Sequence, residues 1–299
     1  MNPRTAFFAC LDRSPPALFE AALWIAAEHD PAVQPLLILQ ELTVLQQQVS
    51  VGMPLLPADE LGQPLLRRLN DLGFAQDDFT PLRPAAALLD KVLQRKRGQP
   101  LAMGLIALEM ARRLDIPMVG VNFPGHFLLR VPGADHLLDP CGGRRLYPND
   151  CRELLHRQYG PNLKLQADHL LTAEPRSILQ RLSRNLRQLH LSNDNPLAAL
   201  IDAERVLELG NASAADYLAR ASLYQRLDCP SAERFDLEHA LLLSEDPIQR
   251  LRLTSGWGTC RPIQWCIELV IAAYMAGRGE RACPALGCAA APIPNPQSI

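Results

Sequence analysis

The chain has 299 residues, of which 48% are hydrophobic and 21% are charged, and its formal charge at pH 7 is −2. This composition is typical of a globular protein, and the length favours two domains. The near-neutral balance gives no electrostatic footprint for nucleic acid, so we do not expect a nucleic-acid partner. Local basic runs such as Arg95-Lys96-Arg97 are interpreted as solvated helix faces.

No segment of the sequence has the pattern of an export signal or a membrane span. The run from Ala6 to Cys10 is too short for a signal-peptide core, and Ile267 to Ala276 is about half of the ~20 apolar residues that a spanning helix needs. We therefore expect a cytoplasmic protein without a membrane partner. The eight cysteines show no tight pairing pattern and should remain thiols in a reducing compartment.

The N-terminal region, from Pro16 to about Asn70, is predicted to be helical. Apolar residues recur with helical spacing, and proline-rich breaks fall at Pro31 to Pro35 and at Pro54 to Pro57. The two predicted stripes are Leu18, Ala22, Trp24 and Ile25, and Leu36, Leu37, Leu39, Leu42, Leu45 and Val49. We expect these helices to cover a core helix and a sheet.

That core helix is predicted to begin near Pro100. Gly98 and Pro100 suit a helix start, because proline at the first turn loses no hydrogen bond. One apolar stripe follows, formed by Leu101, Leu105, Leu108, Ala111 and Leu114. A thiol at such a helix start would be acidified by the helix dipole.

An antiparallel hairpin is predicted after this helix. The strand-like run from His126 to Val131 is joined to His136–Asp139 by the turn cluster Pro132 to Asp135. If these four residues form the loop, Val131 pairs with His136 and Leu128 pairs with Asp139.

Continued pairing in this register would place His126 opposite Cys141. Alternation would then put His126, Leu128, Asp139 and Cys141 on one face of the sheet. His126 would be within reach to donate a ring N–H to Asp139, as in the orienting half of a catalytic triad.

The segment resembles the transglutaminase-like superfamily. In that family a Gly-x-Cys at the helix start, a His opening a later strand and an Asp-Pro one strand on form a Cys-His-Asp triad. Counting back from Ile116-Pro117, which resembles the family's Gly-Ile-Pro, the cysteine position falls on Pro100. The resemblance implies an α+β fold: a helix-rich, papain-like core with a small antiparallel sheet.

A closer resemblance is to the SirB family of bacterial proteins, described as invasion-gene regulators. It covers roughly residues 15 to 250 and is strongest from Leu89 to Gly143, where Gly120 to Arg130 reads Gly-Val-Asn-Phe-Pro-Gly-His-Phe-Leu-Leu-Arg. The chain departs from the pattern at Ala86-Ala87, where the family often has Asn-Ser, and at Cys141, where an aromatic residue is usual. The family implies a transglutaminase-like core followed by tetratricopeptide-type helices.

Residues 175–250 carry a repeat with a period of 34. The shift aligns Leu189 with Leu223, His190 with Tyr224, Ala198 with Ala232, Leu207 with Leu241, and Leu209 with Leu243. This is the tetratricopeptide period, although a generic pair of helical hairpins with a chance offset is the alternative. Two units are too few for independent stability, so we expect them to lean on the preceding domain, residues 1–165.

Residues 255–299 do not continue the repeat and are expected to form an irregular, poorly ordered tail. Their four cysteines do not have the spacing of a structural zinc site. We expect no cofactor and no metal. A separate hypothesis is that this tail is translated out of the ancestral frame.

Two functions from different classes follow. The first is a non-catalytic regulatory adaptor, a pseudoenzyme in which His126 and Asp139 are a vestigial base and orienter and the helical repeats bind another protein. The second is a cysteine-dependent peptidase or acyl transferase in which Cys141, or a distant cysteine, replaces the nucleophile missing at Pro100. Direct DNA binding is a third reading, which the charge balance does not support.

Overall fold

Helix α6 (Pro100–Arg113) is the centre of the core in the computed structural model, which describes residues 2–245 and residue 250. Every residue from 101 to 107 and from 109 to 111 of this helix is buried, so it is covered on nearly every side. The elements around it are α1 (Pro3–Leu11), α2 (Leu18–His29), α3 (Pro35–Ser50), η1 (Ala58–Glu60), α4 (Gly62–Asp71), η2 (Pro84–Ala86) and α5 (Leu89–Arg95).

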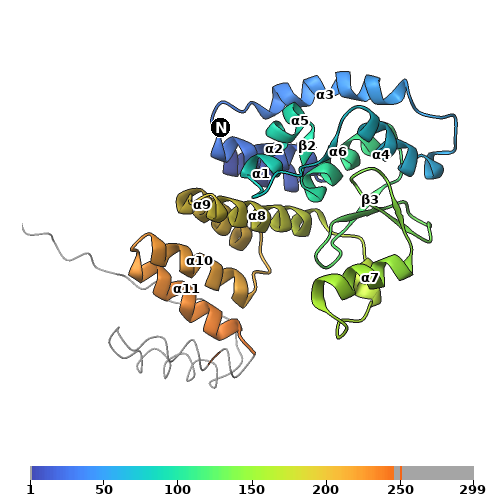
Figure 1. Cartoon of the computed structure of the whole chain (residues 1–299). Coiled ribbons are helices and arrows are strands. Elements are labelled where there is room, and N and C mark those ends of the chain that lie inside the picture. The colour runs from blue at the N-terminus through green and yellow to red at the C-terminus, as the bar shows by residue number, and fades with distance from the viewer. Residues whose placement is uncertain (1, 246–249, 251–299) are drawn as a thin grey trace, which may run out of the picture. The chain divides into compact units, whose positions relative to one another are not determined.

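The predicted helices of the N-terminal region are present as α2, α3 and α4, and the proline-rich breaks separate them (Figure 1). Helix α1 lies before the region predicted to be helical. Helix α3 packs against α2 and α4 along one edge only, with Leu42 and Val49 buried. Leu36 and Leu37 belong to the predicted apolar stripe but are 60% and 50% exposed, because only the edge of α3 that carries Leu42 and Val49 is buried.

Two small sheets complete the core, which confirms the predicted α+β class. A parallel pair joins β1 (Ala75–Gln76) to β2 (Arg97–Gly98). The larger sheet is antiparallel, with strands in sequence order. Its strands are β3 (Val119–Val121), β4 (Leu128–Arg130), β5 (Leu137–Leu138) and β6 (Arg145–Leu146).

The predicted hairpin register is found in the structure. Leu129 pairs with Leu138, which is the alignment that follows from a loop of Pro132 to Asp135. The pairing does not extend to Asp139, because β5 ends at Leu138 and the chain turns from Pro140 onward. His126 and Cys141 are therefore not paired across the sheet.

The two faces of the sheet pack against different elements. Leu129 and Leu138 join the cluster around α6, whereas Leu128 and Leu137 pack with Cys151 on α7 (Pro148–Tyr159). Cys141 packs against the α6 cluster. The prediction that Leu128 and Cys141 share one face is therefore wrong, because the turn after β5 interrupts the alternation.

Helices α8 to α11 form two consecutive helical hairpins. Helix α8 packs with α9, α10 packs with α11, and α9 contacts α10 (Figure 1). The bounds, with the short helix that precedes them, are η3 (Ala167–Leu170), α8 (Pro175–Ser192), α9 (Pro196–Glu208), α10 (Ala214–Arg226) and α11 (Pro230–Leu243).

The turns within the two hairpins are alike at an offset of 34 residues. Asp194 and Asp228 both adopt a left-handed conformation, with φ of 54° and 53°. Asn195 N–H donates to the carbonyl of His190 over 2.9 Å. Its counterpart 34 residues later, Cys229 N–H, donates to the carbonyl of Tyr224 over 2.9 Å. The spacing thus relates backbone geometry as well as side chains, while the tetratricopeptide assignment itself stays a prediction.

Helix α8 also belongs to the core. Ile178, Leu182 and Leu186 are buried in the same apolar cluster as α6, and the residues up to Ser244 form one compact unit. The first hairpin therefore has the support that a short repeat array was expected to need. The tail predicted for residues 255–299 lies outside the described residues.

Candidate functional site

The start of α6 is where the sequence predicted it. Pro100 is the first helical residue, and Gln99 before it has extended backbone angles. Gln99 N–H donates to the carbonyl of Ala86 over 2.7 Å, which fixes the entry of the chain into the helix. Gly98 is required there, because a Cβ would lie 2.7 Å from the side chain of Val92. The structure thus places an imino acid, with no nucleophilic atom, at the helix start.

His126 lies in the turn before β4 and is half-buried. Gly125 has φ of +72°, and His126 N–H donates to the carbonyl of Phe123 over 3.0 Å. The next residue, Phe127, is buried against Gly104 of α6, where a Cβ would lie 2.5 Å from its ring. This close approach of strand and helix holds the turn, and so His126, beside the start of α6.

Asp139 follows β5 and is also half-buried. Its Oδ1 accepts the backbone N–H of Cys141 over 2.8 Å, and its own N–H donates to the carbonyl of Arg144 over 2.9 Å. In the described part of the chain no hydrogen bond joins Asp139 to His126, so the predicted bond is not formed. Asp139 serves the turn instead.

The two groups nevertheless influence each other electrostatically. Burial lowers the pKa of His126, as does the charge of Arg181, while Asp139 opposes both. Burial raises the pKa of Asp139, against the effects of the Cys141 N–H and His126. At neutral pH His126 is therefore an uncharged imidazole.

The environment of Cys141 does not favour a thiolate. Burial raises the pKa of this thiol to about 12, and the nearby carboxylates of Asp139 and Asp78 add to the shift. A reactive cysteine needs the opposite surroundings, with positive charge and access to solvent. The roles proposed from the sequence for His126, Asp139 and Cys141 stay predictions, but the structure does not bring the three into a triad.

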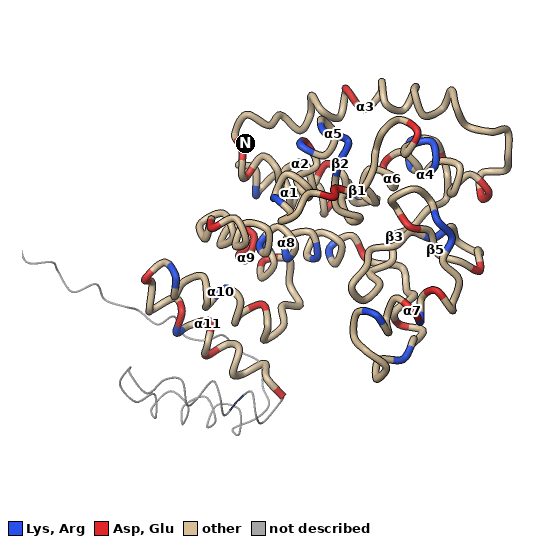
Figure 2. Tube along the Cα trace, in the orientation of Figure 1, with Lys and Arg blue, Asp and Glu red and all other residues tan. Residues whose placement is uncertain are grey.

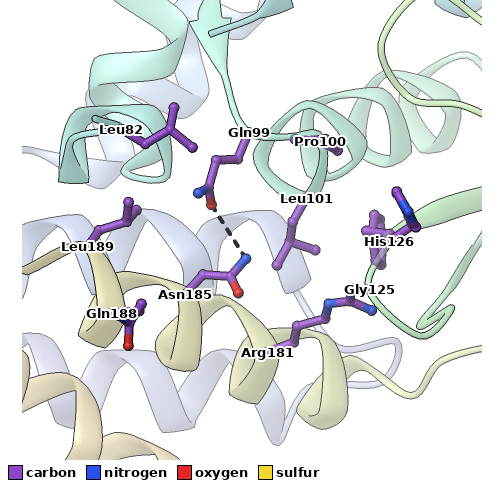
Figure 3. Close-up of a pocket in the computed structure, with 11 residues that line it drawn as sticks. Leu82, Gln99, Pro100, Leu101, Gly125, His126, Arg181, Asn185, Gln188 and Leu189 are labelled. Atoms are coloured by element: carbon purple, nitrogen blue, oxygen red, sulfur yellow. Dashed lines mark hydrogen bonds between the residues drawn. The ribbon is translucent and has the colours of Figure 1, made fainter. Parts of the chain in front are cut away.

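A pocket of about 300 Å³ opens between the start of α6, the turn at His126 and one face of α8 (Figure 3). Pro100 and His126 both line it, so the position predicted for the nucleophile and the predicted base share one cavity. Its full lining is Leu82, Gln99, Pro100, Leu101, Gly125, His126, Phe127, Arg181, Asn185, Gln188 and Leu189.

The wall formed by α8 was missed by reasoning from sequence. Arg181 Nη1 donates to the carbonyl of Phe123 over 2.8 Å, which joins α8 to the turn before His126. Asn185 Nδ2 donates to Gln99 Oε1 over 3.4 Å and joins α8 to the start of α6. The spacing of Arg181, Asn185 and Gln188 indicates one polar helix face. Nothing in that spacing identifies the element across from it.

A second polar cluster lies among α1, α2, α8 and α9. The carboxylate of Asp202 is fully buried and accepts from His29 Nε2 over 2.9 Å, His190 Nδ1 over 2.8 Å and Arg205 Nη1 over 2.7 Å. Arg205 also pairs with Glu28. Burial alone would raise the pKa of Asp202, but Arg205 and the two histidines lower it far below its ordinary value.

His29, His190 and Asp202 of this cluster are the one group in the described part of the chain that could hold a metal ion. A cation there would sit beside the guanidinium of Arg205, which already supplies positive charge to Asp202. Both ring nitrogens that face Asp202 are also engaged with its oxygens. The cluster is therefore better explained as a structural ion network.

Comparison with known proteins identifies a domain that contributes most of the lining of this pocket. The model of the transglutaminase-like superfamily matches residues 37–184, a range that includes Pro100, His126 and Arg181. No solved structure gives a significant match. In the described residues no helix combines the length and the apolar composition needed to cross a bilayer.

Several bacterial relatives match most of the chain. A UPF0162 protein of Pseudomonas aeruginosa is 60% identical over 263 residues, which is 88% of this chain and 97% of the relative. A UPF0162 protein of Xylella fastidiosa is 35% identical over 58% of this chain and 63% of its own length. Protein SirB1 of Salmonella typhimurium is 27% identical over 62% of this chain and 72% of its own length. The resemblance drawn from Leu89 to Gly143 is thus confirmed, and the chain belongs to the UPF0162 family, with SirB1 among its relatives and a transglutaminase-like domain.

Proposed function

We propose that this protein is a non-catalytic member of the transglutaminase-like superfamily that acts as a cytoplasmic protein-interaction adaptor. The observation that carries the proposal is Pro100, which lines the same pocket as His126 and has no atom that can attack a substrate. A base without a nucleophile can bind or position a group, but it has nothing to activate.

The alternative, a thiol enzyme with a relocated nucleophile, has less support. Cys141 is the cysteine nearest in sequence to Asp139, yet burial raises the pKa of its thiol to about 12, and its side chain packs against the apolar core. Cys10 and Cys151 are buried, and burial is the main cause that raises the pKa of each. Cys229 is exposed but lies in the turn between α10 and α11, outside the pocket lining.

The surface proposed to bind a partner is on the second members of the two hairpins. Leu197 on α9 is 63% exposed and Phe235 on α11 is 52% exposed. These exposed apolar side chains would be buried if another protein covered them, which would favour binding. The free thiols of the described cysteines fit the reducing cytoplasm.

The test compares capture of partners by the full-length chain and by a double variant, Leu197→Ser with Phe235→Ser. Both positions are exposed, so the fold should be kept, which circular dichroism and thermal unfolding would check. A partner that uses this surface should be captured by the native chain and lost from the double variant.

The matched control is Val44→Ser with Val51→Ser, which removes two exposed apolar side chains from α3 and the residue after it. This control variant should capture the same partner as the native chain. Equal capture by all three proteins would contradict the proposed surface. Turnover of an amide substrate by the native chain would contradict the non-catalytic assignment.

A further inference from the structure

The pocket beside α6 has a one-sided chemical lining. It presents one guanidinium, from Arg181, one imidazole, from His126, and three side-chain amides, from Gln99, Asn185 and Gln188. No carboxylate is among its lining residues. A cavity with several donors and one positive charge has a positive potential, which favours a negatively charged group.

Arg181 differs from its neighbour on the same helix. Both nitrogens of Arg184 that face Asp216 donate to its carboxylate, over 2.8 and 2.7 Å. Arg181 makes one hydrogen bond, to the carbonyl of Phe123, and no carboxylate of the described residues pairs with it. Figure 2 shows basic residues spaced along α8.

The guanidinium of Arg181 is therefore a partly buried charge without a counter-ion among residues 2–245. Burial lowers its pKa, which shows that the surrounding charges do not compensate the lost solvation. A guanidinium has five N–H donors in a planar fork, and one bond to a carbonyl leaves most of them unused. An anion that accepted two of them would offset the cost of burial.

The rest of the lining limits the size and nature of the ligand. Leu82, Leu101 and Leu189 supply apolar surface, and the amides of Asn185 and Gln188 can pair with an amide of the ligand. The volume of about 300 Å³ is at the lower end of the range for small-molecule sites. Such a space suits a short, partly apolar group that ends in an anion.

We propose that this pocket binds a carboxylate carried on a short apolar peptide segment, with Arg181 as its counter-ion and Asn185 and Gln188 as partners for the adjoining amide. One guanidinium beside an uncharged imidazole balances a single negative charge, which favours a carboxylate over a phosphate dianion. The carboxylate can come from a chain end or from an acidic side chain.

This inference is independent of the surface proposed on α9 and α11. Leu197 and Phe235 do not line the pocket, so their double variant should bind a carboxylate ligand as the native chain does. Failure of either proposal is therefore seen separately from failure of the other.

The test measures binding of small probes to the full-length chain by titration calorimetry. The probes are N-acetyl-Ala-Leu with a free carboxylate, the same dipeptide as its amide, N-acetyl-Ala-Glu-amide and inorganic phosphate. The free acid should bind at least about tenfold more tightly than its amide. Tighter binding of the glutamate probe would assign the site to an acidic side chain, and tighter binding of the free acid to a chain end.

Three variants show whether Arg181 is responsible. Arg181→Gln should remove the difference between acid and amide. Asn185→Asp should do the same by placing an internal carboxylate one helical turn from Arg181. The control Arg176→Gln removes the same charge from an exposed position of α8 outside the pocket and should keep the full difference.

The proposal is overturned by any of three results. Neither the free acid nor the glutamate probe binds the native chain more tightly than the dipeptide amide; Arg181→Gln keeps the preference for the carboxylate probe while the fold is intact; or no probe binds at millimolar concentration. Phosphate binding more tightly than the acid would also contradict the choice of a carboxylate.

Discussion

Pro100 and His126 lie on the wall of one pocket, with the side chain of Phe127 packed against α6 between their elements. The position predicted for a nucleophile and the predicted base therefore share one cavity, although His126 has no hydrogen bond to Asp139 among the described residues. This relationship makes the prediction testable by a single substitution.

Replacing Pro100 by Cys should create a reactive thiol. A cysteine at the first turn of α6 would be stabilised as a thiolate by the helix dipole and by the charge of Arg181 across the pocket. We expect iodoacetamide to label it near neutral pH, whereas Cys141, with a pKa of about 12, stays unlabelled. Mass spectrometry of the peptides across a pH series would measure both.

The control for that experiment is Pro100→Ser, because serine is close in size to the introduced cysteine but lacks its thiol. A labelling profile of the new cysteine that follows an ordinary thiol would show that the helix start has lost its activating environment. Preferential labelling of Cys141 at neutral pH would instead support the thiol-enzyme alternative.

Replacing Asp202 by Asn should be strongly destabilising. The buried carboxylate accepts from Arg205, His29 and His190, and an amide leaves the guanidinium without its charge partner. Breaking a buried ion network in this way costs about 3–5 kcal/mol of the free energy of unfolding. Urea denaturation of the two proteins would measure the loss.

The matched control is Glu208→Gln on the same helix. Glu208 pairs with Arg4, but its side chain is 47% exposed, so we expect a loss of at most about 1 kcal/mol. Equal losses for the two variants would mean that Asp202 contributes no more than a surface ion pair.

Stability should fall in acid partly through Asp216. Burial alone raises the pKa of this carboxylate, but Arg184 and Ser213 outweigh burial and bring it to about 2. A pKa that is lower in the folded state stabilises the fold fully above the unfolded value of about 3.9, and this contribution is lost as the pH falls towards 2. Unfolding free energies from pH 6 to pH 2 should therefore decline less steeply for Asp216→Asn than for the native chain.

Asp12→Asn provides the comparison, because Asp12 is an exposed carboxylate whose nearest ion-pair contact is 3.5 Å from Arg176. The unfolding free energy of this variant should fall between pH 6 and pH 2 as steeply as that of the native chain. A constant difference between the native chain and Asp216→Asn over the whole pH range would contradict the linkage.

Local patterns were enough to predict several parts of this fold. The start of α6 at Pro100 follows from the requirements of a helix N-terminus, and the pairing of Leu129 with Leu138 follows from the turn after Val131. Both depend on residues close together in sequence. The length of the paired region could not be predicted from these patterns. The strand ends before Asp139, whose side chain accepts a hydrogen bond within the following turn.

Long-range contacts were beyond the sequence patterns. Arg181 has the spacing of an ordinary solvated helix residue, and only the packing of α8 on the core brings it to the pocket. Arg205 likewise looks like one member of a surface ion pair, but it is fully buried against Glu28 of α2. In both cases the surroundings of the charge are determined by an element that is far away in the sequence.

The buried contact between Arg205 and Glu28 has a consequence for how this protein can be divided. Glu28 of α2 also forms an ion pair with Arg4 of α1, so its carboxylate joins the first two helices of the chain to α9. A fragment that began at Pro175 would carry Arg205 without that acid, and the remaining piece would carry Glu28 without its innermost base. The helical hairpins should therefore not fold as a separate fragment. On heating, α9 should unfold together with the helices at the N-terminus in one step.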